Sequence, residues 1–208
     1  IEGAPAGGDV SEAVGKVRQA LDVIQSTDPV LEEAISRVRE LLNELKSAGR
    51  GERVAPVPVD VNRLLDGSLL LLRHELKQNT TVERDYGELP EIPGYPGGLG
   101  QVFLNILRNA SQALEGPGTL TVSSAREGDH VVVRIRDTGP GLPAGCSSQM
   151  FQAGWTDKAE GEGMGLGLFI SQRIVKKHDG EIAARNHPEG GAEFTITLPV
   201  AGPAAGDG

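Results

Sequence analysis

Asn105 and Asn109, four positions apart, are the residues of this chain whose type and spacing point most directly to metal chemistry. They lie in the run 99–114, where apolar residues recur every three to four positions, so that a helix would present both amides on one face and pack the opposite face. An amide oxygen is a neutral, hard ligand that suits a Mg²⁺ ion already surrounded by phosphate oxygens and water. The pair therefore predicts a site for Mg²⁺ and a phosphate-bearing ligand.

A second motif, Asp137-Thr-Gly-Pro-Gly141, follows the strand-like run 131–136. The carboxylate of Asp137 can accept a hydrogen bond from an exocyclic amine such as that of adenine, while Gly139 and Gly141 let the backbone approach a flat ring. An aspartate before Gly-Pro-Gly is also an ordinary turn signal. Taken alone, this motif leaves both interpretations open.

A third motif, Gly161-x-Gly163-x-Gly165-x-Gly167, runs directly into an expected apolar helix over 164–178. Backbone amides in a glycine-rich turn and at a helix N-terminus carry positive partial charge that suits phosphates. A single glycine-rich stretch is more often only a turn or a cap. The three motifs occur together within 105–167, and this combination predicts an ATP site.

With these motifs the chain resembles the ATP-binding domain of sensor histidine kinases, within the superfamily shared with gyrase and mismatch-repair ATPases. The resemblance covers roughly residues 56–199. The segment 150–158, Met-Phe-Gln-Ala-Gly-Trp-Thr-Asp-Lys, resembles the family's phenylalanine box, which is a flexible lid over the triphosphate. The ending 190–199 resembles the family's final strand.

The resemblance implies a role for each motif. Asn109 is expected to be the principal Mg²⁺ ligand, and Asn105 is expected to touch the water shell of the ion or a phosphate. In ATP-hydrolysing members of the superfamily, a glutamate at the position of Asn105 activates water. An amide cannot act as a general base, so the match favours phosphoryl transfer over hydrolysis. Asp137 is expected to bind the amino group of adenine.

Further contacts to the nucleotide are expected from the lid and the glycine box. Gln112 stands where many kinases place a phosphate-facing lysine, which leaves Lys158 or Arg108 as the candidate cation. Phe151 and Trp155 are expected to form a hydrophobic latch that docks when nucleotide is present. The expected nucleotide-binding set is Asn105, Arg108, Asn109, Gln112, Asp137, Gly139, Gly141, Phe151, Thr156, Lys158, Gly163, Gly165, Leu166 and Gly167.

The segment 11–50 predicts a helical hairpin that precedes this domain. Its apolar residues recur at coiled-coil spacings of three and four, and Thr27-Asp-Pro29 reads as a helix cap followed by a proline at the first helical position. A second copy of the hairpin would close a four-helix bundle, as in the dimerisation region of the family. The alternative is a hairpin that packs on its own ATP domain in a monomer.

The phosphate-accepting histidine of the family is missing from its expected place. No histidine precedes His74, and the acceptor position should fall near residues 8–13. Either the acceptor has been removed from this chain or the natural protein lacks it. The sequence His74-Glu-Leu-Lys77 matches the pattern of the acceptor box. It lies in the expected first helix of the ATP domain, which Asp60 caps, so we interpret the match as a decoy, that is, a histidine that does not accept phosphate. His178 is expected to cap and pack near a helix C-terminus.

We expect an α+β fold in which a mixed, largely antiparallel sheet and three helices form a two-layer sandwich. Hairpin turns are expected at 127–129 and 189–191. The expected domains are a flexible linker over 1–10, the hairpin over 11–50, the ATP-binding domain over 53–200 and a disordered tail over 201–208. The expected strands are 54–59, 80–86, 120–124, 131–136, 181–185 and 193–198, and the expected helices are 61–77, 98–114 and 164–178.

Composition restricts the partners. The net charge of −9 argues against nucleic acid, and no apolar run approaches the length of a membrane span. The lone cysteine, Cys146, is typical of cytosolic proteins, although a larger membrane-anchored parent remains open. The sequence thus predicts the ATP- and Mg²⁺-dependent catalytic part of a homodimeric histidine kinase that serves a response regulator receiver domain. The alternative is a nucleotide-binding pseudokinase or scaffold without autophosphorylation.

Overall fold

The structure is a computed structural model, and it describes residues 55–73, 76, 80–114, 116–146, 149–155 and 165–203. Several expectations fall outside these residues. They are the linker 1–10, the hairpin 11–50, the last residues of the tail, His74, and the candidate site residues Thr156, Lys158 and Gly163.

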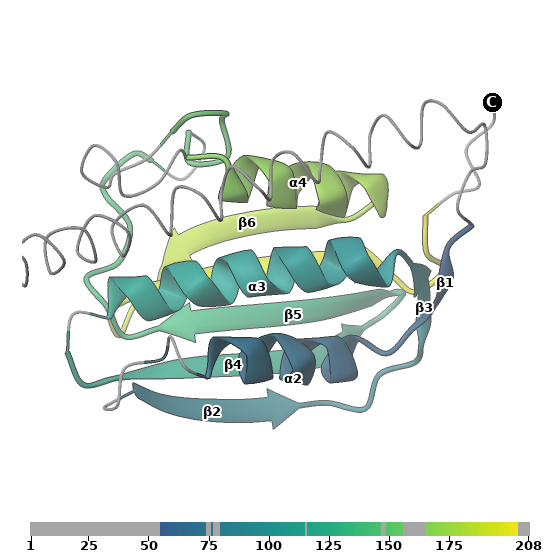
Figure 1. Ribbon diagram of the computed structural model, residues 1–208, viewed down its shortest axis with the longest axis horizontal. Coiled ribbons are helices and arrows are strands. Elements are labelled where there is room, and N and C mark those ends of the chain that lie inside the picture. Colours follow the sequence, from purple (N-terminus) through teal and green to yellow (C-terminus); the bar gives the residue numbers. More distant parts are fainter. Residues whose placement is uncertain are drawn as a thin grey trace, which may run out of the picture. The chain divides into compact units, whose positions relative to one another are not determined.

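One layer of the fold is a mixed five-stranded sheet with the strand order β2-β4-β5-β7-β6 (Figure 1). β2 pairs with β4 in parallel, and the other neighbours pair antiparallel. This arrangement confirms the expected mixed, largely antiparallel sheet. The strands are β2 (Thr80–Tyr86), β4 (Gly118–Glu127), β5 (His130–Asp137), β6 (Glu181–Asn186) and β7 (Ala192–Pro199).

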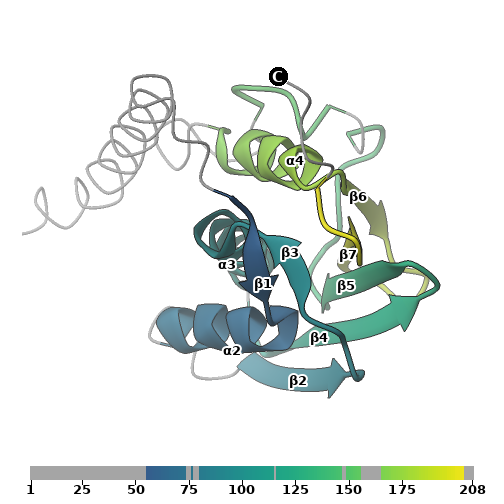
Figure 2. The same cartoon turned by 90° about the vertical axis from the view of Figure 1, so that its right-hand side faces the viewer.

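The second layer consists of α2 (Val61–Leu72), α3 (Pro96–Ala113) and α4 (Gly167–Lys177), which cover one face of the sheet (Figures 1 and 2). α3 lies between the other two helices. The core forms where apolar faces of both layers meet, and it includes Leu65 and Ile106 from the helices and Val133 from the sheet. The expected two-layer α+β sandwich is confirmed.

The first strand does not join the main sheet, which corrects the expectation from the sequence. β1 (Val57–Val59) pairs antiparallel with β3 (Ile92–Gly94) to form a separate two-stranded sheet. The sequence did not reveal β3, because three residues, Ile-Pro-Gly, are too few to show a period and proline lacks a ladder donor.

The helix boundaries also differ from the expected ones. α2 ends at Leu72 rather than at 77, and Leu76 lies in a bend. Its beginning is as expected, because the side chain of Asp60 accepts a hydrogen bond of 3.0 Å from the backbone N–H of Arg63. α4 begins at Gly167 rather than at 164, because Gly165 has a φ of +63° that no helical residue adopts.

Both expected hairpin turns are confirmed. β4 and β5 are paired up to Glu127 and His130, with Gly128 in the left-handed region at φ +62°. β6 and β7 are paired up to Asn186 and Ala192, so the second turn closes over 187–191. Glycines supply the positive φ angles that such tight turns require.

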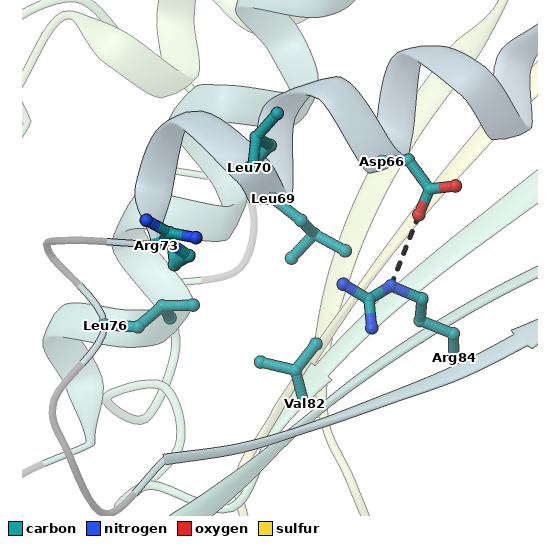
Figure 3. A pocket seen from close by; sticks show the side chains of 7 residues that line it. All are labelled: Asp66, Leu69, Leu70, Arg73, Leu76, Val82 and Arg84. Atoms are coloured by element: carbon teal, nitrogen blue, oxygen red, sulfur yellow. Dashed lines mark ion pairs between the residues drawn. The ribbon is translucent and has the colours of Figure 1, made fainter.

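A pocket lies between α2 and the edge strand β2 (Figure 3). An ion pair of 3.3 Å joins Asp66 to Arg84 at one end of it. Burial and the neighbouring Asp66 raise the pKa of Tyr86, next to this ion pair, to about 12. No residue of the three motifs lines the pocket, whose walls are formed by Asp66, Leu69, Leu70, Arg73, Leu76, Val82 and Arg84.

No helix in the described part of the chain is both long enough and apolar enough to span a bilayer.

Candidate nucleotide site

α3 presents the first motif as its periodicity predicts. Phe103, Ile106 and Leu107 are fully buried in the core, whereas Asn105 and Asn109 are half-buried on another face of the helix. A 3.6-residue repeat places residues four apart on the same face, so the two amides lie one turn from each other. Arg108 is half-buried and Gln112 is exposed on the same helix.

The first and third motifs meet at the N-terminus of α4. The side-chain amide of Asn105 donates to the carbonyl oxygen of Gly167 at 3.3 Å and contacts the hydroxyl of Ser171 at 3.5 Å. Ser171 is fully buried, and its hydroxyl donates to the same carbonyl at 2.8 Å. The sequence motifs did not identify Ser171, although a serine inside an apolar helix, four residues after a glycine of the box, is a usable signal.

The carboxylate of Asp137 is held in a buried position at the end of β5, and only 1% of the residue is exposed. Its Oδ1 accepts hydrogen bonds from the backbone N–H of Gly139 at 2.9 Å and of Ala192 at 3.3 Å. Within the described residues both bonds end on Oδ1. A buried carboxylate requires hydrogen-bond partners of this kind.

The glycines beside Asp137 are required by their surroundings. A Cβ on residue 139 would lie 2.8 Å from the carbonyl oxygen of Ala113, at the end of α3. Gly141 has a φ of +83°, and a Cβ there would lie 2.7 Å from the side-chain oxygen of Asn186. The sequence singled out both glycines for a role at the base, which stays a prediction, and it could not show which neighbours exclude a side chain.

The end of the β6–β7 hairpin contributes residues that the motifs missed. Ala192 donates to Asp137, a Cβ on Gly191 would meet the carbonyl oxygen of Asp137, and Asn186 contacts the backbone of Leu142. In the sequence, Gly190-Gly191 indicated only a turn. Nothing local indicated that this turn supports a motif some fifty positions earlier.

The described end of the glycine box, from Gly165 to Gly167, contacts the described part of the lid through Gly165. Gly154 donates to the carbonyl oxygen of Gly165 at 3.2 Å, and a Cβ on Gly165 would collide with the carbonyl oxygen of Trp155. Leu166 precedes α4, and Gly167 is its first residue. Phe151 is buried in the hydrophobic core. Trp155 is partly buried and packs against this core.

The described residues contain no group of three or more His, Cys, Asp or Glu side chains placed to hold a metal ion. The amide oxygens of Asn105 and Asn109 are neutral, hard donors of a kind that can ligate a cation beside phosphate oxygens. Mg²⁺ is commonly held in this way, through few protein ligands and substrate phosphates.

Known proteins resemble the chain in both sequence and fold. The chain is 31% identical over 201 residues to the sensor histidine kinase ZraS of Escherichia coli K12, covering 96% of this chain but only 40% of that protein. The fold matches that of the mycobacterial sensor histidine kinase MprB with a TM-score of 0.63 and 27% identity, over 71% of this chain and 99% of that one. It also matches full-length ShkA in complex with AMPPNP, with a TM-score of 0.68 and 24% identity, over 97% of this chain and 41% of that one.

The family match covers the site itself. Residues 94–202, just over half of the chain, match the family described as histidine kinase-, DNA gyrase B- and HSP90-like ATPase. This range contains all three motifs and the supporting turn between β6 and β7. The chain therefore belongs to the family of histidine kinase-, DNA gyrase B- and HSP90-like ATPases.

Proposed function

We propose that this chain is the ATP-binding catalytic part of a sensor histidine kinase, which transfers the γ-phosphate of ATP to a histidine for relay to a response regulator. The observation that carries the proposal is the contact between Asn105 and Gly167, because it joins the expected metal-binding motif to the helix N-terminus expected to face phosphates. ZraS and MprB are sensor histidine kinases, and the structure of ShkA is a complex with AMPPNP.

The residues at the site have distinct tasks in this proposal. Oδ2 of Asp137 accepts a hydrogen bond from the exocyclic amine of adenine, while Gly139 and Gly141 let the backbone lie against the base. The N-terminus of α4 binds phosphate oxygens through its backbone amides. Asn109, with Asn105, supplies amide oxygens to Mg²⁺, which when bound neutralises charge on the phosphates. Arg108, Gln112, Phe151 and the lid residues Thr156, Lys158 and Gly163 complete the proposed set.

Asn105 also favours transfer over hydrolysis. It cannot deprotonate water, and its Nδ2 is already committed to Gly167. A phosphoryl group held at this site is thus available to an acceptor side chain rather than to activated water. This part of the proposal depends on the amide at residue 105 alone.

Dimerisation through residues 11–50 and pairing with a receiver domain extend the proposal to the whole protein. The chain spans about 40% of the length of the E. coli relative. A nucleotide-binding pseudokinase is the second candidate, and the sequence supports it because residues 8–13, where the acceptor is expected, contain no histidine. Both candidates require ATP binding, so they differ only in phosphoryl transfer.

The first test measures ATP binding by titration calorimetry with Mg²⁺, for the wild type and for Asp137→Ala. We expect the variant to weaken ATP binding at least tenfold, because a charge-assisted hydrogen bond of about 1.5–3 kcal/mol is lost. Asp85→Ala is the matched control, since it removes an exposed carboxylate from β2. Wild-type protein that does not bind ATP would contradict both candidates.

The second test incubates the chain with γ-labelled ATP and Mg²⁺ and maps the label by peptide analysis. Acid-labile label on a histidine supports the kinase, and label on His74 would show that this residue is no decoy. ATP binding without label supports the pseudokinase or an ATP domain separated from its acceptor. Addition of a separate acceptor domain from a related kinase distinguishes these two cases.

A further inference from the structure

The end of the β6–β7 hairpin holds both ends of the segment 137–142. Asn186 and Ala192 are register partners, the last pair of the two strands before the turn. Ala192 donates its backbone N–H to Asp137 at one end of the segment, and Asn186 contacts Leu142 at the other end. One pair of opposite residues on the two strands therefore holds both ends of the segment that carries Gly139 and Gly141.

Asn186 uses both atoms of its amide in this contact. Its Oδ1 accepts from the backbone N–H of Leu142 at 2.6 Å, and its Nδ2 donates to the carbonyl oxygen of Leu142 at 3.0 Å. The side chain thus binds Leu142 as a neighbouring strand would, across 44 positions of sequence. Two simultaneous bonds to one residue fix its orientation as well as its position.

Gly141 shows how tightly this contact defines the local backbone. Its φ of +83° lies in the left-handed region, and the place of a Cβ is taken by Oδ1 of Asn186 at 2.7 Å. The backbone of residue 141 therefore lies in direct contact with the side chain of Asn186. Without Asn186 the segment loses the two bonds that select this one conformation among those open to Gly-Pro-Gly.

We propose that Asn186 is a positioning residue for recognition of the nucleotide base. It touches no ligand itself, but it holds 139–142 so that the glycine backbone and the carboxylate of Asp137 present one preformed surface to adenine. This inference rests on the proposed nucleotide function. It assigns to the exposed end of β6 a part in base selectivity that the three motifs do not contain.

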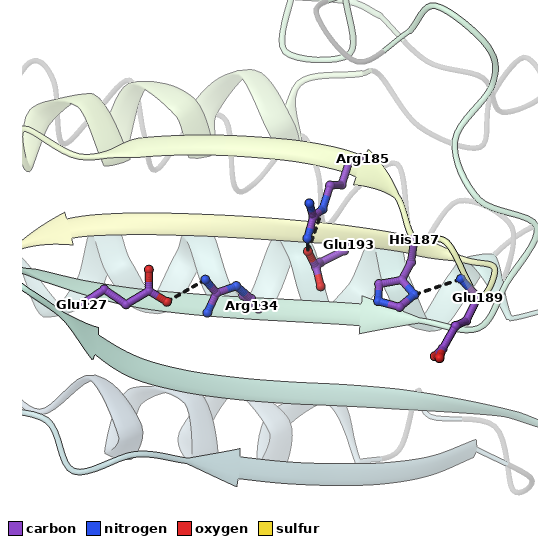
Figure 4. Close-up of polar contacts among 6 residues, drawn as sticks. All are labelled: Glu127, Arg134, Arg185, His187, Glu189 and Glu193. Atoms are coloured by element: carbon purple, nitrogen blue, oxygen red, sulfur yellow. Dashed lines mark hydrogen bonds and ion pairs between the residues drawn. The ribbon is translucent and has the colours of Figure 1, made fainter.

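The hairpin does not need Asn186 for its own stability. The two strands are paired from Glu181 to Asn186, and Arg185 binds Glu193 across them at 2.6 Å (Figure 4). Asn186 is exposed, and its side-chain bonds go to Leu142 rather than to β7. Its replacement should therefore leave the fold intact and change mainly the segment 137–142.

A second asparagine offers a matched control. Asn62 also makes two side-chain hydrogen bonds, donating to the carbonyl oxygen of Gly87 at 3.0 Å and accepting from the hydroxyl of Ser124 at 2.7 Å. It joins α2 to the sheet, and none of its partners belongs to the three motifs. Asn62→Ala thus removes the same number of bonds without touching the expected base site, and Arg185→Ala removes the adjacent ion pair.

The experiment measures dissociation constants for ATP and for inosine triphosphate, which carries a carbonyl oxygen in place of the exocyclic amine. A ribose-labelled fluorescent ATP analogue serves as the competing probe. We expect the wild type to prefer ATP. Asn186→Ala should weaken ATP binding about tenfold and the binding of inosine triphosphate by less, so that the preference for ATP falls. Asn62→Ala and Arg185→Ala should keep the wild-type ratio. An unchanged ratio in Asn186→Ala overturns the inference.

Hydrogen exchange of the Leu142 amide tests the positioning without any nucleotide. It should be faster in Asn186→Ala, and also in Asn186→Asp, which keeps an acceptor for this amide but loses the donor to the Leu142 carbonyl. Exchange at the wild-type rate in both variants overturns the inference. Wild-type protein that binds neither nucleotide overturns the proposed function instead, while the exchange result still decides whether Asn186 orders the segment.

Discussion

The backbone N–H of Tyr95 donates a hydrogen bond of 2.9 Å to Nε2 of His178, which is 2% exposed. Nδ1 of this histidine must then carry the proton, and it donates to the carbonyl oxygen of Ile174 at 2.7 Å. The two rings meet edge to face at 5.2 Å. His178 therefore joins the end of α4 to the junction of β3 and α3, and the expectation that it caps and packs a helix C-terminus is confirmed.

This contact predicts that stability falls in mild acid. Burial lowers the pKa of His178 below 6.5, and the neighbouring Lys177 lowers it further. The folded state therefore favours the neutral ring, so its contribution is complete above pH 6.5 and is lost as pH falls through the lowered pKa. We expect the free energy of unfolding, measured in urea, to decrease from pH 7.5 to pH 5.

His178→Gln provides the comparison for this prediction, because a glutamine oxygen can still accept from Tyr95 but does not titrate. The pH dependence of the variant should be shallower than that of the wild type over the same range. His178→Ala should cost on the order of 2 kcal/mol at neutral pH, since it leaves a cavity and an unsatisfied backbone N–H. Parallel pH profiles for wild type and His178→Gln would argue against this role.

Gly165 and Gly67 should respond in opposite directions to the same substitution. Gly165→Ala forces an alanine into φ +63° and against the carbonyl oxygen of Trp155. We therefore expect the free energy of unfolding to fall by about 1–3 kcal/mol and ATP binding to weaken. Gly67 lies within α2, and a Cβ there meets nothing within 4 Å. Gly67→Ala should stabilise the protein by about 0.5–1 kcal/mol. Thermal unfolding and ATP titration of the two variants measure both effects.

Removal of Mg²⁺ tests the proposed ligand Asn109. The half-buried amide of Asn109 should contribute to ATP binding only when the cation is present, so Asn109→Ala should weaken Mg²⁺-ATP binding about tenfold. In EDTA the wild type and the variant should bind ATP equally and weakly. Gln112→Ala, from the next turn of α3, should have a smaller effect in Mg²⁺. A defect of Asn109→Ala that persists in EDTA would mean that the side chain serves the fold rather than the metal.

Local sequence patterns were sufficient for the features that depend on neighbours along the chain. The periodicity around Asn105 and Asn109 fixes which face of α3 is apolar, because a 3.6-residue repeat needs no distant partner. The glycines at 128 and at 190–191 indicated both hairpin turns, because tight turns require positive φ angles. Motif order and the strand before Asp137 were likewise readable from residues close together in sequence.

Short elements and one helix end could not be predicted from the sequence. The strand Ile92–Gly94 is stabilised only by its partner, so its three residues carry no period of their own. The end of α2 at Leu72 was equally hidden, because Leu76 continues the apolar spacing although the chain has already bent. The pairing of this strand and the end of this helix both depend on the segments that the fold places next to them.

The sequence by itself determined that this chain carries an amide pair, a carboxylate beside glycines and a glycine-rich helix start, because each of these is a local pattern. Only the tertiary structure decided how they are joined. Asn105 meets Ser171 across 66 positions, Asp137 meets Ala192 across 55, and Leu142 meets Asn186 across 44. Such contacts follow from strand order and helix packing, since hydrogen bonds between distant residues leave no periodic trace in the sequence.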